Sequence, residues 1–404
     1  MKDEKKAPKL RFKVFTDDWE QCKLGDVATF SKGTGYSKSD LIETGSPIIL
    51  YGRLYTKYET KIQNVDTFVV PKAGSVVSKG GEVIVPGSGE TAQDISIASV
   101  VEPAGILLGG DLNIIYPNTD LDPTFLAITI SNGRPHFDMA RRAQGKSIVH
   151  LHNADLKQIL LKTPNLSEQK QICRIFESLD CTITLHEEKK CQLERLKSAL
   201  LQKMFADKSG YPTVRFVGFE NAWEQCKLGD VFVESTEKSK DDNEELLSVT
   251  LKDGVIKAKS LDRKNNASFD KKNYKLVIPN DIAYNSMRMW QGALGVSKYR
   301  GIVSPAYTVI KLRNQLENPY FYQYYFKKSE TLNLFRKNSQ GLTSDTWNLK
   351  YPLFSRIHFF TTSIEEQQKI SSLLNLLDRT ITLHDHKLEL LKRMKQSLLQ
   401  KMFI

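Results

Sequence analysis

The chain has 404 residues, enough for two or more domains that each bury a hydrophobic core of their own. Its composition, 40% hydrophobic and 26% charged, is ordinary for a soluble globular protein, and no apolar run approaches the length needed to span a membrane. The net charge of +11 favours a polyanionic partner, nucleic acid before a membrane surface, with an incidentally basic protein as the alternative.

Cysteine usage and the N-terminal segment both predict a cytoplasmic protein. The charged residues between Met1 and Lys9 do not resemble a secretory signal. The cysteines are odd in number and include no C-x-x-C pair, which favours free thiols over a disulfide framework or a zinc site. They are Cys22, Cys173, Cys181, Cys191 and Cys226.

The chain contains an internal repeat. Trp19 to Val27 recurs without change as Trp223 to Val231. Near the end of each half, Leu200 to Phe205 recurs as Leu398 to Phe403. The two middle segments between these shared ends have little sequence in common. Two near-identical frames around dissimilar inserts indicate one task carried out twice on two different targets.

Both middle segments are predicted to be mixed α/β domains on a common plan. Pro123 and Pro319 stand at matched positions and each is expected to open a helix. Alternating or apolar runs of β-forming residues predict the strands. These strands are expected at Glu82 to Val85, Ile95 to Val101, Ile114 to Tyr116, Asp281 to Tyr284 and Tyr307 to Leu312.

Each half ends in a predicted long helix. Residues 168–205 contain neither Gly nor Pro, and apolar residues recur there and in the second copy at heptad spacing, which is typical of a coiled coil. With one apolar seam per half, each helix is the expected partner of the other. His186 and His384 lie within the seam, where a polar residue that fixes register is favoured over metal binding or pH sensing. The expected coiled-coil and partner contacts are Ile172, Leu179, His186, Leu193, Leu200, Ile370, Leu377, His384, Leu391 and Leu398.

These patterns predict an α/β (α+β) fold class with two globular domains and two long helices. The expected boundaries are 1–166 for the first domain and 167–206 for its helix, then 207–364 and 365–404 for the second pair. The segment Lys208 to Pro212 is expected to end the first helix and link the halves.

Fragments that resemble enzyme motifs are incomplete. Gly145-Lys146-Ser147 resembles the end of a phosphate-binding loop, but Ala140 stands where that motif needs a glycine. Asn318-Pro319-Tyr320-Phe321 resembles a methyltransferase corner, but the second proline is missing. No carboxylate spacing specifies a metal nuclease. We therefore expect no catalytic residue, no metal site and no cofactor bound by this chain.

Features suited to DNA are more coherent. Basic residues precede the matched pairs Gln144-Gly145 and Gln340-Gly341, and two matched but unlike loops follow the strands at 82–85 and 281–284. Lys and Arg can contact phosphates, while Asn, Gln and Arg can read base edges. Ordinary variable surface loops are the alternative. The predicted DNA-binding residues are Arg53, Ser88, Gln93, Arg141, Arg142, Gln144, Lys146, Asn285, Ser286, Arg288, Met289, Gln291, Lys337, Asn338, Gln340 and Thr343.

Taken together, the doubled motifs resemble the specificity subunits of Type I restriction–modification systems. The resemblance spans nearly the whole chain, and it is the ordered, doubled set that makes it specific. The motifs are Leu10-Arg11-Phe12, Trp19-Glu20 and Leu24-Gly25-Asp26 with their copies from Val214 to Asp230, Glu168-Gln169 with Ile172, Glu366-Gln367 with Ile370, and the two Leu-Leu-Gln-Lys-Met-Phe endings.

The resemblance implies two target-recognition domains held apart by two antiparallel helices. Each domain would read one half of a bipartite DNA sequence, and the helix pair would set the gap. The partners it implies are double-stranded DNA, two methyltransferase subunits that methylate adenine, and restriction subunits that carry the motor and nuclease. S-adenosylmethionine, ATP and magnesium are expected on those partners. A stand-alone DNA nuclease and a basic scaffold protein are the alternatives.

Overall fold

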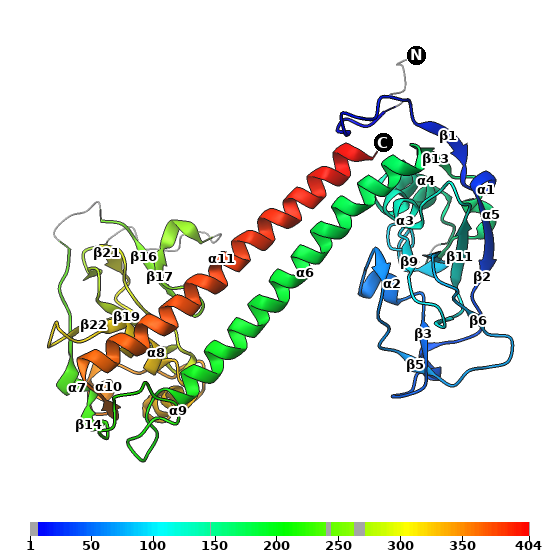
Figure 1. The fold of residues 1–404 in the computed structure, drawn as a ribbon. Helices are drawn as coiled ribbons and strands as arrows, with labels where there is room; N and C mark the ends of the chain where they lie inside the picture. The colour runs from blue at the N-terminus through cyan, green and yellow to red at the C-terminus, as the bar shows by residue number, and fades with distance from the viewer. Residues whose placement is uncertain (1–6, 146, 240–243, 262–270, 404) are drawn as a thin grey trace. The chain divides into compact units, whose positions relative to one another are not determined.

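The structure is a computed structural model that describes residues 7–145, 147–239, 244–261 and 271–403 (Figure 1). The chain forms two compact units. The first consists of Met1–His186 with Lys387–Ile404, and the second of Glu187–His386. Two long helices, α6 (Leu166–Lys203) and α11 (Ile364–Met402), contribute to both units. Each therefore begins in one unit and ends in the other.

The first unit is built mainly of strands. They are β1 (Glu20–Lys23), β2 (Ala28–Lys32), β3 (Ser46–Ile49), β4 (Lys61–Ile62), β5 (Phe68–Val69), β6 (Val76–Val77), β7 (Glu82–Pro86), β8 (Ser88–Gly89), β9 (Ser99–Val101), β10 (Leu107–Leu108), β11 (Leu112–Pro117), β12 (Val149–His150) and β13 (Leu160–Thr163). One sheet has the order β2-β11-β7-β9-β4 and another β5-β3-β10-β6, while β1 pairs with β13 and β8 with β12. Its helices besides α6 are α1 (Leu24–Val27), α2 (Arg53–Thr56), α3 (Pro123–Asn132), α4 (Arg134–Arg142), α5 (Asn153–Leu156) and the 3-10 turn η1 (Lys38–Asp40).

The second unit repeats this plan, with fewer strands among its described residues. They are β14 (Glu224–Lys227), β15 (Phe232–Glu234), β16 (Leu247–Thr250), β17 (Gly254–Lys257), β18 (Lys275–Val277), β19 (Ile282–Asn285), β20 (Leu294–Val296), β21 (Gly301–Val303), β22 (Tyr307–Leu312) and β23 (His358–Thr361). The main sheet has the order β15-β22-β19-β20, and β14 pairs with β23. The helices besides α11 are α7 (Leu228–Val231), α8 (Pro319–Phe326), α9 (Ser329–Asn338), α10 (Tyr351–Phe354) and the 3-10 turns η2 (Ala258–Ser260) and η3 (Met289–Gln291).

The common plan predicted for the two middle segments is confirmed. In the first unit β11 pairs antiparallel with β2 and β7, and in the second β22 pairs antiparallel with β15 and β19. The matched prolines open α3 and α8. Asp122 caps α3 by accepting from the N–H groups of Thr124 and Phe125, and Asn318 caps α8 by accepting from the N–H of Tyr320.

The repeated Glu-Gln pair at the start of each long helix joins that helix to its domain. The Glu168 carboxylate accepts two hydrogen bonds from Arg11 at 2.7 Å, and Glu366 accepts two from Arg215 at 2.8 Å. The Gln169 side chain accepts from the Asp122 N–H and donates to the Pro164 carbonyl. Because both glutamates are fully buried, these charge-assisted bonds offset a large desolvation cost.

The glutamine of the second half makes the same kinds of hydrogen bond. The Gln367 side chain accepts from the Asn318 N–H and donates to the Thr362 carbonyl. The repeated opening strand is held likewise, because β14 pairs with β23 in the register that β1 keeps with β13. The two frames are thus alike in their bonds as well as in their sequence.

The repeated ending of each long helix closes a hydrophobic core. Phe205, just past the end of α6, packs on Phe321 and Trp223 in the second unit, with ring centroids 5.3 and 6.2 Å apart. Phe403, just past the end of α11, packs on Phe125 in the first unit at 5.7 Å. Such aromatic packing adds about 0.5–1.5 kcal/mol per pair beyond burial of the rings.

The long helices pack against each other antiparallel within each unit (Figure 1). In the first unit, Leu179 and Ile183 of α6 cluster with Leu388 and Leu391 of α11. Two ion pairs at repeat-equivalent positions fix the register. Lys395 pairs with Asp180 in the first unit, and Lys197 pairs with Asp378 in the second. The prediction that each helix is the other's partner is therefore confirmed.

One sequence expectation needs correction. The strand expected from Ile95 is present only from Ser99, because the preceding residues form a turn in which the Ile95 N–H donates to the Thr91 carbonyl. Ile172 and Ile370, expected in the coiled coil, are buried in the hydrophobic clusters of their domains. The remaining apolar seam positions, Leu179, Leu193, Leu200, Leu377, Leu391 and Leu398, all pack in the hydrophobic clusters that include the long helices.

Candidate nucleic-acid interface

Two loops meet in the first unit at the end of β7. We name residues 86–94 the variable loop and residues 144–150 the Gln-Gly loop. Strand β12 of the Gln-Gly loop pairs antiparallel with β8 of the variable loop, and the Leu151 N–H donates to the Gly87 carbonyl at 3.0 Å. The fold therefore joins two segments that the sequence singled out separately.

The second unit brings its matched loops together in the same way. Here the variable loop is 285–291 and the Gln-Gly loop is 340–348. The Leu349 N–H donates to the Ser286 carbonyl at 2.9 Å, and the rings of Trp290 and Trp347 meet edge to face with centroids 5.1 Å apart. The Trp290 Nε1–H donates to the Met287 carbonyl. The sequence did not predict a role for Trp347, because its contact with Trp290 arises only from the tertiary fold.

A glycine makes each Gln-Gly loop possible. Gly145 and Gly341 have φ angles of 137° and 142°, and a Cβ at these positions would lie 1.9 Å from the Ile148 carbonyl oxygen and 2.6 Å from that of Thr346. The glutamine before each glycine exchanges two backbone hydrogen bonds across the loop, Gln144 with His150 and Gln340 with Asn348. The matched pairs thus have a structural role, while both glutamine side chains stay exposed.

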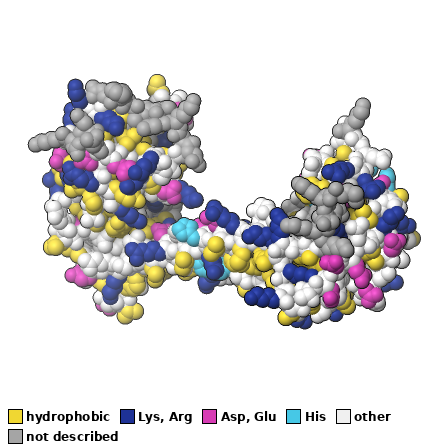
Figure 2. All heavy atoms as spheres, turned by 90° about the horizontal axis from the view of Figure 1, so that it is seen from above, with side chains coloured by type: hydrophobic (Ala, Val, Ile, Leu, Met, Phe, Trp, Pro, Cys, Tyr) yellow, Lys and Arg dark blue, Asp and Glu magenta, His cyan; other side chains and the backbone are white. Residues whose placement is uncertain are grey.

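Most of the predicted polar side chains are exposed around these loops. The exposed ones are Gln93, Arg141, Arg142, Gln144, Arg288, Gln291, Lys337, Gln340 and Thr343. Among the described residues, Arg142 and Arg288 have no side-chain hydrogen bond or ion pair. Figure 2 shows Lys and Arg side chains on the surface of both units. Lys146 lies outside the described residues.

Three of the residues predicted to contact DNA have buried side chains, namely Ser88, Ser286 and Met289. The Ser88 hydroxyl donates to the Asp111 carboxylate at 3.1 Å, and the Ser286 hydroxyl lies 2.8 Å from that of Thr308. Met289 has no exposed surface and packs in the core of the second unit. These buried residues stabilise the variable loops. Their substitution would affect ligand binding only indirectly, by changing the conformation of the loop.

Local hydrogen bonds occupy three further candidates. The Asn285 side chain accepts from the Met287 N–H at 3.0 Å, and that of Asn338 donates to the Leu334 carbonyl at 2.9 Å. The Thr343 hydroxyl lies 3.3 Å from the hydroxyl of Thr346. Their polar atoms first stabilise a turn or helix end.

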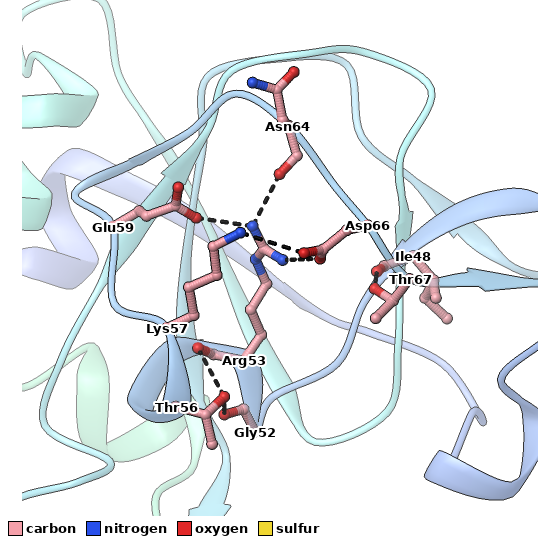
Figure 3. Close-up of polar contacts among 9 residues, drawn as sticks. All are labelled: Ile48, Gly52, Arg53, Thr56, Lys57, Glu59, Asn64, Asp66 and Thr67. Atoms are coloured by element: carbon pink, nitrogen blue, oxygen red, sulfur yellow. Dashed lines mark hydrogen bonds and ion pairs between the residues drawn. The ribbon is translucent and has the colours of Figure 1, made fainter. Parts of the chain in front are cut away.

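Arg53 is held in a network of polar contacts within the first unit (Figure 3). Its guanidinium donates to Asp66 at 2.7 Å, to Glu59 at 2.8 Å and to the Asn64 carbonyl at 2.9 Å, and only 8% of the side chain is exposed. The two carboxylates balance the charge of the guanidinium and occupy its N–H donors. DNA binding by Arg53 therefore stays a prediction that this arrangement disfavours.

Substitution of Arg53 should therefore affect stability and not DNA binding. We expect Arg53→Ala to lower the free energy of unfolding by about 1–3 kcal/mol, since it removes several charge-assisted hydrogen bonds. Chemical denaturation and DNA-binding titrations would check both halves of this expectation. Weaker DNA binding at unchanged stability would restore the phosphate-contact interpretation.

Two lysines before the second Gln-Gly loop are also structural. Lys328 is buried, and its Nζ donates to the carbonyls of Phe205 and Ala206 at the end of α6. Burial lowers the pKa of Lys327. The positive surface near this loop therefore begins at Arg336 and Lys337.

Among the described residues, no cluster of three or more His, Cys, Asp and Glu side chains could hold a metal ion. Within the same described residues, no helix combines the length and the apolar character needed to cross a membrane.

Comparison with known proteins identifies the family. The model of the Type I restriction modification DNA specificity domain matches residues 16–195 and again 220–393. A Type I restriction enzyme MjaVIII specificity subunit from Methanocaldococcus jannaschii is 22% identical over 209 residues. That alignment covers 50% of this chain and 48% of the relative, so the chain spans about half the length of this curated relative.

Solved structures share the fold. A Type I restriction–modification S subunit from M. genitalium superposes with a TM-score of 0.59 at 14% identity, covering 98% of this chain and 99% of that one. A structure described in connection with complex assembly and conformational transition of the Type I R-M system gives a TM-score of 0.50 at 16% identity, covering 95% and 97%.

The fold and the two domain matches define a protein with two DNA specificity domains. The chain belongs to the family of Type I restriction–modification specificity subunits. Subunits of this family recognise DNA and are not themselves catalytic, which agrees with the expectation that this chain is not an enzyme.

Proposed function

We propose that this chain is the DNA-reading subunit of a methyltransferase complex, and that each domain reads one half of a split target. The main supporting observation is that each unit places a variable loop of different sequence beside a Gln-Gly loop at a matched position on the same frame. A common frame with different exposed side chains is what two different half-sites require. Polar side chains of the variable loops read major-groove edges, and basic residues hold phosphates.

The long helices are proposed to set the gap between the half-sites. Two features support this role: each helix is continuous, with 38 residues in α6 and 39 in α11, and the two helices pair in both units. A rigid spacer makes half-site separation a matter of geometry, as in other DNA-binding proteins with two reading heads.

Two modification subunits are the proposed partners, one for each frame. Large apolar side chains remain exposed along the long helices, some at repeat-equivalent positions. They are Leu185 with Leu383, Leu196 with Met394, and also Leu376 and Leu390. Exposed apolar groups at matched places are suited to two copies of one partner. S-adenosylmethionine on these partners, and ATP and magnesium on restriction subunits, complete the proposed complex.

Arg288 offers the sharpest test of base reading. We expect Arg288→Ala to relax or abolish recognition of the half-site read by the second domain, at about 1–3 kcal/mol of discrimination, while assembly with the partner is unchanged. The measurement is the methylated motif in DNA from cells that express the complex.

A matched control is Arg300→Ala, which removes a charge just before β21, where Arg300 pairs with Glu244 at 2.9 Å. It should leave the motif intact. An unchanged motif in the Arg288→Ala variant as well would remove Arg288 from the reading set.

A further inference from the structure

The second Gln-Gly loop presents a leucine entirely to solvent. Leu342 is 100% exposed, directly after the glycine that shapes the loop. The loop around it is closely hydrogen-bonded: the Thr343 N–H donates to the Thr346 hydroxyl, and the Thr346 and Trp347 N–H groups donate to the Thr343 carbonyl. Burial of a leucine side chain would contribute about 1.5–3 kcal/mol of hydrophobic stabilisation, which this exposed position does not gain.

The matched loop of the first unit has an exposed aliphatic residue too. Ile148, three residues after Gly145, is 57% exposed. The two Gln-Gly loops have different sequences and lengths, yet both expose one large apolar side chain beside a variable loop. Occurrence in both units argues against an isolated accident of one surface loop.

Segments next to the second Gln-Gly loop carry exposed basic residues. Arg288 of the adjoining variable loop, Lys337 at the end of α9 and Lys350 beyond the loop are exposed. From residue 331 to residue 364 the sequence contains one carboxylate, Asp345. An exposed apolar side chain on a loop whose neighbouring segments carry exposed cations matches a ligand with a charged outside and an apolar interior, which is the chemistry of duplex DNA.

We propose that Leu342 and Ile148 are apolar wedges that enter the base stack when the domains bind their half-sites. This inference rests on the proposed function and adds to it how the duplex is opened. Apolar side chains between base steps unstack them at a cost of a few kcal/mol. An adenine must leave the stack before a methyltransferase can reach it, so each wedge lowers the cost of that step on its own half-site.

The test uses the chain co-expressed with its modification subunit and a duplex that carries the mapped target. A 2-aminopurine in place of a base within the half-site read by the second domain reports unstacking as a rise in fluorescence. We expect Leu342→Ser to abolish this rise and to slow methylation of that half-site about tenfold, with the motif unchanged. Ile148→Ser should do the same on the other half-site only.

Val217→Ser is the matched control. Val217 is 99% exposed in the same unit but belongs to neither the variable loop nor the Gln-Gly loop, so its replacement should change neither signal. Because Leu342 makes no buried contact, its replacement should leave the melting temperature unchanged.

Three outcomes would overturn the wedge proposal. The first is a Leu342→Ser complex whose fluorescence rise and methylation rate match those of the unsubstituted complex. Loss of the modification subunit from Leu342→Ser would identify Leu342 as a protein contact instead. An unsubstituted complex that methylates its split motif without any rise in fluorescence would reject the wedge while leaving the proposed function in place.

Discussion

A matched heptad insertion into both long helices should lengthen the gap of the recognised motif by about three base pairs. Seven helical residues add about 10 Å, and one base pair occupies about 3.4 Å. Insertion after His186 and after His386 follows the boundary between the two units, so the pairs Asp180–Lys395 and Lys197–Asp378 both persist. A heptad also preserves the phase of the apolar seam. The measurement is the gap in the methylated motif.

A single insertion serves as the control. With only α6 lengthened, Lys395 and Asp378 of α11 cannot both keep their α6 partners in register. Such a variant should lose assembly or methylation. Matched insertions that methylate the motif with its original gap would contradict the spacer role of the helices.

Loss of Arg215 should strongly destabilise the second unit. Arg215→Ala leaves the Glu366 carboxylate buried without its bidentate partner, and we expect a loss of about 3–5 kcal/mol in the free energy of unfolding. Arg11→Ala should act likewise on Glu168 in the first unit. Denaturant titration followed by circular dichroism measures both.

Two further variants test whether the unpaired buried charge causes this loss of stability. Arg393→Ala removes an exposed pair with Glu389 within one helix and should cost at most about 0.5 kcal/mol. The double replacement Arg215→Met with Glu366→Leu should regain most of the lost stability, because no unpaired charge remains. A double variant as unstable as Arg215→Ala would show that packing of the arginine, and not its charge, carries the effect.

The sequence predicts this architecture well where a residue's role is local or repeated. Heptad spacing predicts α6 and α11 to within a few residues, and the matched Pro123 and Pro319 predict the starts of α3 and α8. Repetition itself marks Glu168 and Glu366, but not their reason. Their arginine partners lie more than 150 residues away, so the ion pairs emerge only from the fold.

The candidate site is predictable in outline but not residue by residue. Loop position follows from the strands before it, so both variable loops are found. Whether a side chain points outward depends on tertiary partners, as with Ser286 against Thr308 and Arg53 between two carboxylates. The proximity of Trp347 to Trp290 is likewise invisible in the sequence.

The most direct test of the central claim is to co-express the chain with its modification subunit and map methylated adenines by long-read sequencing. Our account predicts one split motif, methylated on both strands, with a single fixed gap between two unlike half-sites. A stable complex that methylates no DNA, or that methylates a continuous motif, would contradict it.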